Sequence, residues 1–155
     1  MNDDIELLGL GLPADALPVG RRFRTVGRTL TEADLVGFIG VTGMVEVLFT
    51  QADRLPGQVI QGRLVPGVMV YAFAEGLLIQ SVMQDVGLAF LGAEISARAP
   101  VRVGDTIHVR CEVTENRPSR RRPGTALVRT RNEVVNQQGV VALEYSPLRL
   151  LKQSR

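Results

Sequence analysis

The spacing of apolar residues changes along the chain, from a helical period in the first half to a period of two in the second. Thr31 and Asp34 have the spacing of a capping box, so we expect a helix to begin there and to end at Gly40 and Gly43. Residues 44–66 combine Pro and Gly with short apolar pieces. This composition predicts a loop that contains one helical turn.

A second helix is predicted from Gly67 to Met83, followed by antiparallel strands from Phe90 onward. Apolar side chains fall all round the helix, so we expect it to be buried on every side. The strands alternate apolar and polar residues over 106–113, 126–135 and 140–151, with Arg-Pro-Gly and Gln-Gln-Gly as turns. The pattern predicts an α+β fold in which a curved antiparallel sheet surrounds one long helix. The apolar helix residues are Val68, Met69, Val70, Tyr71, Ala72, Phe73, Ala74, Leu77, Leu78, Ile79 and Val82.

Length and composition fit one domain over residues 1–155, because 155 residues with 45% apolar content suit a single core. The single cysteine, Cys111, excludes an internal disulfide, and no Cys/His cluster is present to hold zinc. The N-terminus is acidic where a signal peptide is basic, and charged or amide side chains interrupt every apolar stretch. We therefore expect a cytoplasmic protein that does not span a membrane.

Charge is distributed unevenly. Residues 1–97 hold 6 Arg against 11 acids, giving −5, and residues 98–155 hold 11 Arg and 1 Lys against 5 acids, giving +7. Four arginines lie beside two prolines at a predicted loop tip, where we favour a solvated hairpin over a phosphate clamp. Seven aromatic residues and no Trp leave little for base stacking, so we expect no nucleic-acid partner. The loop arginines are Arg117, Arg120, Arg121 and Arg122.

Four segments resemble the MaoC-like family of hotdog proteins: Thr29–Leu35, Val65–Met69, Ile95–Ile107 and Asn136–Gly139. The resemblance implies a hotdog fold that dimerises edge to edge. It also implies an acyl thioester of coenzyme A bound in a tunnel at the dimer interface, and often hydration of a 2-enoyl chain.

The family's hydratase motif, Gly-Asp-x-Asn-Pro-x-His, corresponds here to Gly43–Phe49. In the family, the Asp and the His hold and activate the water that adds to the double bond. Met44 stands at the Asp position and Phe49 at the His position, and neither side chain has a titratable proton. Glu46 stands at the Asn position. We therefore expect the usual hydration mechanism to be absent.

Three features remain candidates for a site, and Gly67 and Glu46 are the first two. The resemblance implies that the thioester carbonyl lies at Gly67, with Val68 beside it, because the free N–H groups of a helix N-terminus polarise a carbonyl. The alternative is that Pro66 and Gly67 only start the helix. Glu46 is a candidate base if burial raises its pKa, and the alternative is a carboxylate that faces solvent or pairs with an Arg.

Glu75 is the third candidate, because it lies among apolar residues on the second helix. A buried, unpaired carboxylate would cost several kcal/mol, so we expect a partner or a chemical role. Glu75 resembles the catalytic acid that hotdog thioesterases carry on their central helix, and an ion pair with an Arg such as Arg63 or Arg98 is the alternative. His108, the only histidine, falls on the polar side of its strand, where we expect an exposed side chain without a catalytic role.

Three functions follow from these observations. The first is an acyl-CoA-binding protein, or a divergent 2-enoyl-CoA hydratase or dehydratase with a substitute base. The second is a non-catalytic subunit that partners a hotdog chain with an intact Asp and His. The third is a thioesterase that uses Glu75. We expect a homodimer, and neither a cofactor nor a metal is implied.

Overall fold

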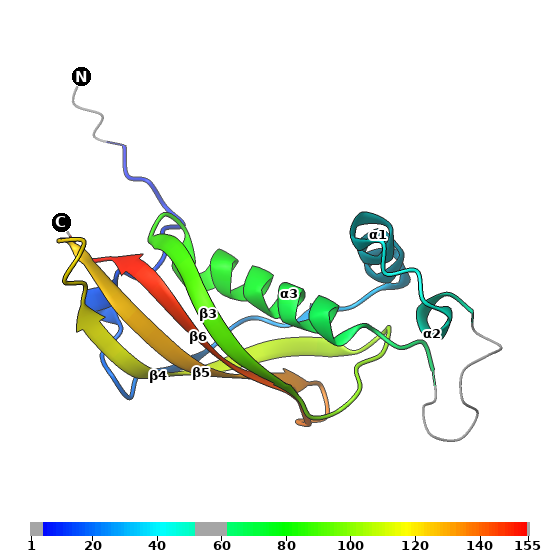
Figure 1. Cartoon of the computed structure of the whole chain (residues 1–155). Coiled ribbons are helices and arrows are strands. Elements are labelled where there is room, and N and C mark those ends of the chain that lie inside the picture. The colour runs from blue at the N-terminus through cyan, green and yellow to red at the C-terminus, as the bar shows by residue number, and fades with distance from the viewer. Residues whose placement is uncertain (1–4, 52–61, 155) are drawn as a thin grey trace.

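One antiparallel sheet curves around the helix α3 (Gly67–Leu78) in the computed structural model, which describes residues 5–51 and 62–154 (Figure 1). The strand order is β1-β4-β5-β6-β3, and β2 pairs with β4 outside this path. The predicted α+β hotdog architecture is confirmed. The strands are β1 (Arg22–Arg24), β2 (Arg28–Thr29), β3 (Gly87–Ala97), β4 (Thr106–Pro118), β5 (Thr125–Asn136) and β6 (Val141–Lys152).

The three last strands have one dry and one wet face, as their alternation predicts. The inward residues of β4 from Ile107 to Val113 are at most 4% exposed, whereas Arg110 between them faces solvent. The turns that follow β4 and β5 contain Gly124 and Gly139, at φ of 77° and 81°. Glycine adopts these left-handed angles without steric cost, which explains why the chain reverses at both predicted turns.

Helix α1 (Glu32–Thr42) begins at the predicted capping box. The Asp34 N–H donates to Thr31 Oγ1 at 3.2 Å, and the Thr31 N–H donates to Asp34 Oδ2 at 2.9 Å. Gly43 ends the helix at φ 71°, while Gly40 remains helical. A single-turn helix, α2 (Val47–Thr50), follows, and the rest of the predicted loop over 52–61 lies outside the described residues.

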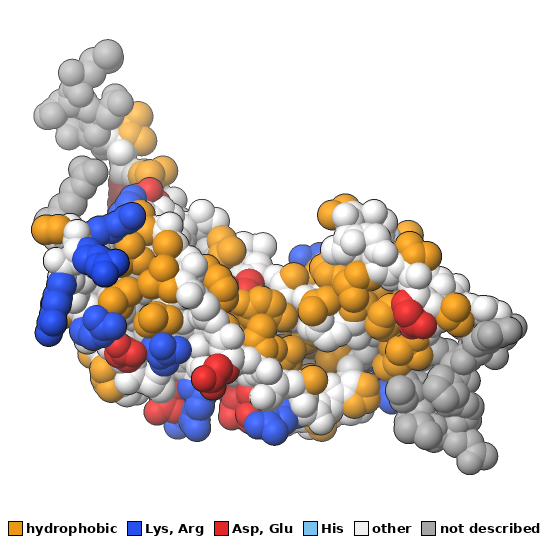
Figure 2. Space-filling model, viewed as in Figure 1, with side chains coloured by type: hydrophobic (Ala, Val, Ile, Leu, Met, Phe, Trp, Pro, Cys, Tyr) orange, Lys and Arg blue, Asp and Glu red, His pale blue; other side chains and the backbone are white. Residues whose placement is uncertain are grey.

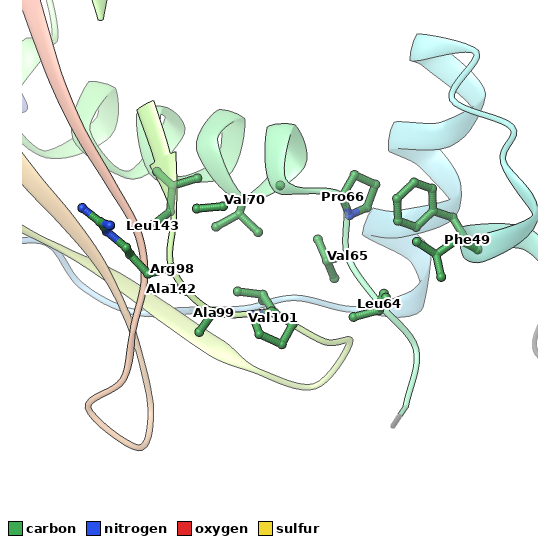
Figure 3. Close-up of a pocket in the computed structure, with 14 residues that line it drawn as sticks. Phe49, Leu64, Val65, Pro66, Val70, Arg98, Ala99, Val101, Ala142 and Leu143 are labelled. Carbon is green, nitrogen blue, oxygen red and sulfur yellow. The ribbon is translucent and has the colours of Figure 1, made fainter. Parts of the chain in front are cut away.

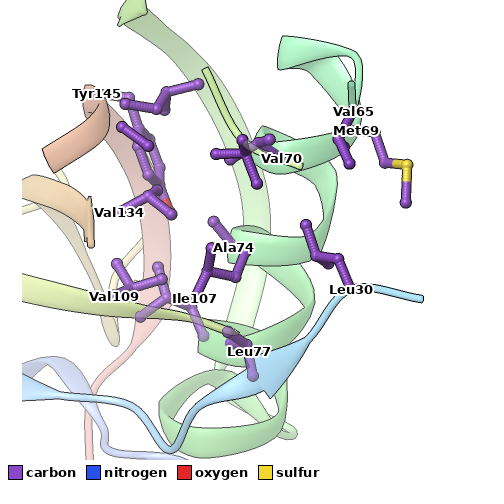
Figure 4. Close-up of a cluster of buried hydrophobic side chains, with 14 of the residues drawn as sticks. Leu30, Val65, Met69, Val70, Ala74, Leu77, Ile107, Val109, Val134 and Tyr145 are labelled. Atoms are coloured by element: carbon purple, nitrogen blue, oxygen red, sulfur yellow. The ribbon is translucent and has the colours of Figure 1, made fainter. Parts of the chain in front are cut away.

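Helix α3 presents one face to the concave side of the sheet and forms the centre of the core (Figure 4). It continues into η3 (Ile79–Met83), a π-helical turn, so the predicted helix from Gly67 to Met83 is confirmed with a change of hydrogen-bond pattern at its end. The buried residues of α3 are Met69, Val70, Ala74, Leu77 and Leu78.

The expectation that this helix is buried on every side is wrong for a single chain. Val68 is 53% exposed and Ile79 is 47% exposed, because the sheet covers only one side of α3. Strand β3 lies beside this side at the sheet edge and begins at Gly87, earlier than predicted. Its large apolar residues Leu88, Phe90 and Ile95 are 44–54% exposed. One side of α3 and the edge of β3 thus form a continuous apolar surface.

Candidate functional site

An apolar pocket of about 410 Å³ lies where α3 begins (Figure 3). Its walls come from α2, the segment before α3, the loop after β3 and the start of β6. Most of the lining is aliphatic or aromatic, and Arg98 is the one charged residue among the described residues that line it. The Arg98 guanidinium is directed to Glu144, with Nη2 2.7 Å from Oε2. Prominent apolar lining residues are Phe49, Val65, Val70, Val101 and Leu143.

Backbone pairing fixes the position of this pocket. The Val65 N–H donates to the Val101 carbonyl at 2.9 Å, and the Val103 N–H donates to the Arg63 carbonyl at 2.9 Å. The segment before α3 therefore lies antiparallel to the segment that leads into β4. Because Pro66 follows directly, the first turn of α3 opens onto the pocket.

The first turn of α3 has unused hydrogen-bond donors. The N–H groups of Met69 and Val70 donate to the Pro66 carbonyl, and no side chain from the described part of the chain caps the helix. Among the described residues, no acceptor binds the N–H groups of Gly67 and Val68. These donors lie at the positive end of the helix dipole, so they suit a carbonyl oxygen or an anion.

Gly67 lines the pocket, and nothing lies within 4 Å of the position that a Cβ would take there. Its φ is outside the left-handed region, so the backbone does not require glycine at this position. The absence of a side chain leaves open space in front of the Gly67 N–H group. Val68 does not line the pocket.

The segment that corresponds to the hydratase motif contributes Leu48 and Phe49 to the pocket wall. Phe49 lies in the pocket wall, and Met44 is half-buried just before α2. Glu46 is exposed, and its Oε2 accepts a hydrogen bond from the Leu48 N–H at 2.7 Å. The Glu46 carboxylate thus caps α2 and is not among the groups that line the pocket.

Glu75 belongs to a different place in the fold. Arg149 Nη2 donates to both oxygens of Glu75, at 2.5 and 2.7 Å, and the Tyr145 hydroxyl donates to Oε1 at 2.9 Å. The predicted ion pair exists, but the suggested partners are wrong, because Arg63 pairs with Glu32 and Arg98 with Glu144. Arg149 comes from the inner face of β6, which the sequence spacing alone does not place beside α3.

The structure does not bring Glu75 and Gly67 into one cavity. Glu75 borders a groove of about 300 Å³ between η3 and β3, together with Ile79, Phe90 and Arg149. Burial, and secondarily the Glu75 charge, raises the pKa of the Tyr145 hydroxyl. This hydroxyl is therefore held protonated, as a donor to Glu75.

Sequence reasoning missed a polar row across the inner face of the sheet. Cys111, Asn132 and Tyr145 are adjacent cross-strand partners in β4, β5 and β6, and all three are buried. Neither end of the Asn132 amide has a hydrogen-bond partner of standard geometry within the described residues, and the same holds for the Thr130 hydroxyl. The signal was present, because Thr130 and Asn132 occupy inward positions of the β5 alternation.

His108 lies on β4 away from the pocket and is half-buried, so it is less exposed than predicted. Burial lowers the pKa of its imidazole, and the nearby charges of Arg110 and Arg24 lower it further. Within residues 5–51 and 62–154, no three acidic, His or Cys side chains are arranged to hold a metal ion. Nor does any helix in these ranges have the length and apolar character needed to cross a membrane.

Solved structures with this fold include several MaoC-like proteins. A MaoC-like dehydratase from Rhodospirillum rubrum is 26% identical over 94% of this chain and 99% of its own, with a TM-score of 0.79. An R-hydratase from Pseudomonas aeruginosa is 22% identical over 93% of this chain and 88% of its own, with a TM-score of 0.78.

A protein from Mycobacterium tuberculosis with a double hotdog fold is 23% identical over 93% of this chain. The match has a TM-score of 0.83 and covers 45% of that longer chain. At such identities the likeness shows the fold. No protein of curated function matches the sequence. The family model described as the MaoC like domain matches residues 15–138, which is most of the chain, and the protein therefore belongs to this family.

Proposed function

We propose that this MaoC-like domain binds an acyl thioester in the pocket at Gly67 and does not hydrate it by the Asp/His mechanism. The observation that carries the proposal is a pocket of about 410 Å³ with an apolar lining and a free helix N-terminus at its edge. Its size falls within the usual range for small-molecule sites, which combine an apolar wall with few polar groups.

In this proposal, the Gly67 N–H donates to the thioester carbonyl oxygen, and the helix dipole stabilises the partial negative charge there. The acyl chain lies against Val65, Val70 and Leu143, which line the pocket. The absence of a side chain at Gly67 leaves the approach to the donor open.

Hydration needs a group that takes a proton from water and a group that returns one to the substrate. Phe49 lies in the pocket wall where the family resemblance puts the His, and Met44 takes the place of the Asp. Arg98 is charged, but its guanidinium binds Glu144, and a guanidinium group donates hydrogen bonds and accepts none. We therefore expect hydration to be slower than in relatives that have the Asp/His pair, by about 10²-fold to 10⁴-fold for each missing group.

Titration with crotonyl-CoA, followed by an assay of its hydration, tests both parts of the proposal. We expect saturable binding with negligible turnover, and the double substitution Met44→Asp/Phe49→His should increase hydration by about 10²-fold or more. The single substitution Phe49→His is the matched control, since it leaves the second group missing. Turnover typical of an enzyme in the unmodified chain would contradict the loss of hydration, and an absence of binding would contradict the thioester site.

We further propose that the chain forms a homodimer through β3. An exposed edge strand with apolar side chains offers unpaired backbone groups and apolar area to a second strand. The uncovered side of α3 continues this surface. The alternative partner at this surface is a second hotdog chain that keeps the Asp/His pair. The match of this chain to one half of a double hotdog protein supports that alternative. Copurified partner chains and sedimentation of the purified chain distinguish the two assemblies.

A further inference from the structure

The loop between β4 and β5 carries three consecutive arginines on a fixed backbone. The Ser119 N–H donates to the Thr125 carbonyl at 2.9 Å, and the Thr125 hydroxyl donates to the Arg122 carbonyl at 2.6 Å. The Gln153 N–H also donates to the Gly124 carbonyl at 2.9 Å, which ties the loop to the end of β6. The arginine side chains are exposed, but the backbone that carries them is held at both ends.

These arginines have no counter-charge among the residues that the structure describes. The guanidinium groups of Arg120, Arg121 and Arg122 form no ion pair and no hydrogen bond within residues 5–51 and 62–154. Other arginines on the same sheet are paired, as Arg129 with Glu115 and Arg131 with Glu112 show. Three adjacent positive charges repel one another, so an anion bound between them would relieve an unfavourable interaction.

An apolar groove lies beside the loop. Its volume is about 490 Å³, and its apolar wall consists of Ala89, Leu91, Leu127 and Leu150. Figure 2 shows basic side chains gathered at this end of the molecule next to an apolar area. The groove is therefore bordered by positively charged side chains of the loop on one side and by aliphatic side chains on the other.

A β-bulge in β3 contributes to the groove. Phe90 and Gly92 pair with successive residues of β6, so Leu91 is an extra residue between them. Gly92 has φ 147°, which a residue with a side chain rarely adopts. Bulges redirect side chains, and here Leu91 is 52% exposed and lines the groove. The exposed part of the Leu91 side chain is not covered by the core and is available for contact with a ligand.

From this geometry we infer a second binding site, separate from the pocket at Gly67, for a phosphorylated amphiphile, in place of the solvated hairpin that the sequence alone favours for the loop arginines. The phosphate group binds Arg120, Arg121 and Arg122, because guanidinium groups form bidentate, charge-assisted hydrogen bonds with phosphate oxygens. The apolar part of the ligand covers Leu91 and Leu127. No aromatic side chain lines the groove among the described residues, so bases would have nothing to stack on, which argues against single-stranded nucleic acid.

Octyl phosphate, used below its micelle concentration, is the probe that tests this site by calorimetric titration. Binding should be at least about tenfold tighter than for inorganic phosphate or octyl glucoside, since each of these lacks one half of the interaction. The substitution Arg120→Gln/Arg121→Gln should weaken binding of octyl phosphate by about 100-fold. Arg22→Gln/Arg24→Gln is the matched control, because it removes the same charge from β1, outside the groove.

Two further variants locate the ligand. Leu91→Gln should weaken the binding of octyl phosphate but not the binding of inorganic phosphate. Gly67→Val should leave the binding of octyl phosphate unchanged. The two variants therefore distinguish a failure of this site from a failure of the thioester pocket. Co-sedimentation with phosphatidylglycerol vesicles, but not with phosphatidylcholine vesicles, would identify a lipid as the source of the phosphate. Binding in solution without co-sedimentation would identify a free ligand. Equal binding by the Arg120→Gln/Arg121→Gln variant and the parent chain would overturn the inference.

Discussion

Glu75 on α3 and Arg149 on β6 form an ion pair between the central helix and the sheet, with the Arg149 Nη2 atom 2.5 and 2.7 Å from the two carboxylate oxygens. Their side chains are 18% and 9% exposed, and Tyr145 donates a further hydrogen bond to Glu75. Both charges are therefore largely removed from water and compensated within the protein. The ion pair gives Glu75 a structural role. The sequence alone did not distinguish this role from a catalytic role.

Removing one partner of this pair should destabilise the fold. We expect Glu75→Leu to lower the free energy of unfolding by about 3 kcal/mol, because it leaves the Arg149 charge buried without compensation. The double substitution Glu75→Leu/Arg149→Leu should cost less than the single one, since no charge then remains. Urea denaturation measures both. A single variant as stable as the parent chain would show that the ion pair is unimportant for stability.

Glu46 provides a second prediction, because its carboxylate caps the helix that carries Phe49 into the pocket wall. Glu46→Gln keeps an oxygen for the Leu48 N–H, so thioester affinity should be unchanged. Glu46→Ala removes the cap, which is worth about 1 kcal/mol in typical helices, and should weaken binding severalfold. Calorimetric titration of the two variants with an acyl-CoA compares them directly. Hydration that is present in the parent and absent in Glu46→Gln would instead identify Glu46 as a base.

Cys111 should be unreactive in the folded protein. Burial raises the pKa of its thiol from 9.0 to about 12, and the side chain is 4% exposed. The unfolded chain loses this proton near pH 9, so the stabilisation from the protonated thiol is complete below pH 9 and is lost as the pH rises towards 12. Stability above pH 9 should therefore fall more steeply in the parent than in Cys111→Ala. Thiol labelling at pH 8 that is as fast in buffer as in urea would contradict this.

The edge of β3 should support self-association. We expect the parent chain to sediment as a dimer at micromolar concentration and Ile95→Lys to shift it to monomer, because a charged side chain on an edge strand opposes pairing. Ile95 is 49% exposed in the single chain, so the substitution should not disturb the core. Val41→Lys is the control, since Val41 is 90% exposed on α1, away from the sheet edge. A monomeric parent chain would rule out the proposed homodimer.

Much of the fold could be predicted because local signals and the global structure agree. The capping box at Thr31, the inward alternation of β4 and the glycine turns each depend on neighbouring residues only. The side of α3 that stays exposed was not predictable, because apolar residues surround the helix and the sequence does not state which of them a sheet of this size covers. Because β3 borders the same exposed surface, its residues show no clear alternation of buried and exposed positions.

The sequence named residues of the candidate pocket only through the resemblance to a family. Gly67 and Phe49 line one pocket, and their roles in binding stay predictions. The partner of Glu75 was missed because Arg149 is 74 residues away and reaches α3 only through the order of the strands. The apolar groove at the arginine loop was missed for the same reason, since Leu91, Leu127 and Leu150 come from three strands.

The measurement that tests the central claim most directly is a calorimetric titration of Gly67→Val with an acyl-CoA. A branched side chain at Gly67 would stand between the free N–H and the pocket, so we expect thioester binding to fall by about 100-fold or more. The variant should fold, because nothing lies within 4 Å of the new Cβ and φ is not left-handed. Gly37→Val on α1, a helical glycine with equally open space, is the control and should bind like the parent. If Gly67→Val binds the thioester as tightly as the parent chain, the carbonyl site is not at the start of α3.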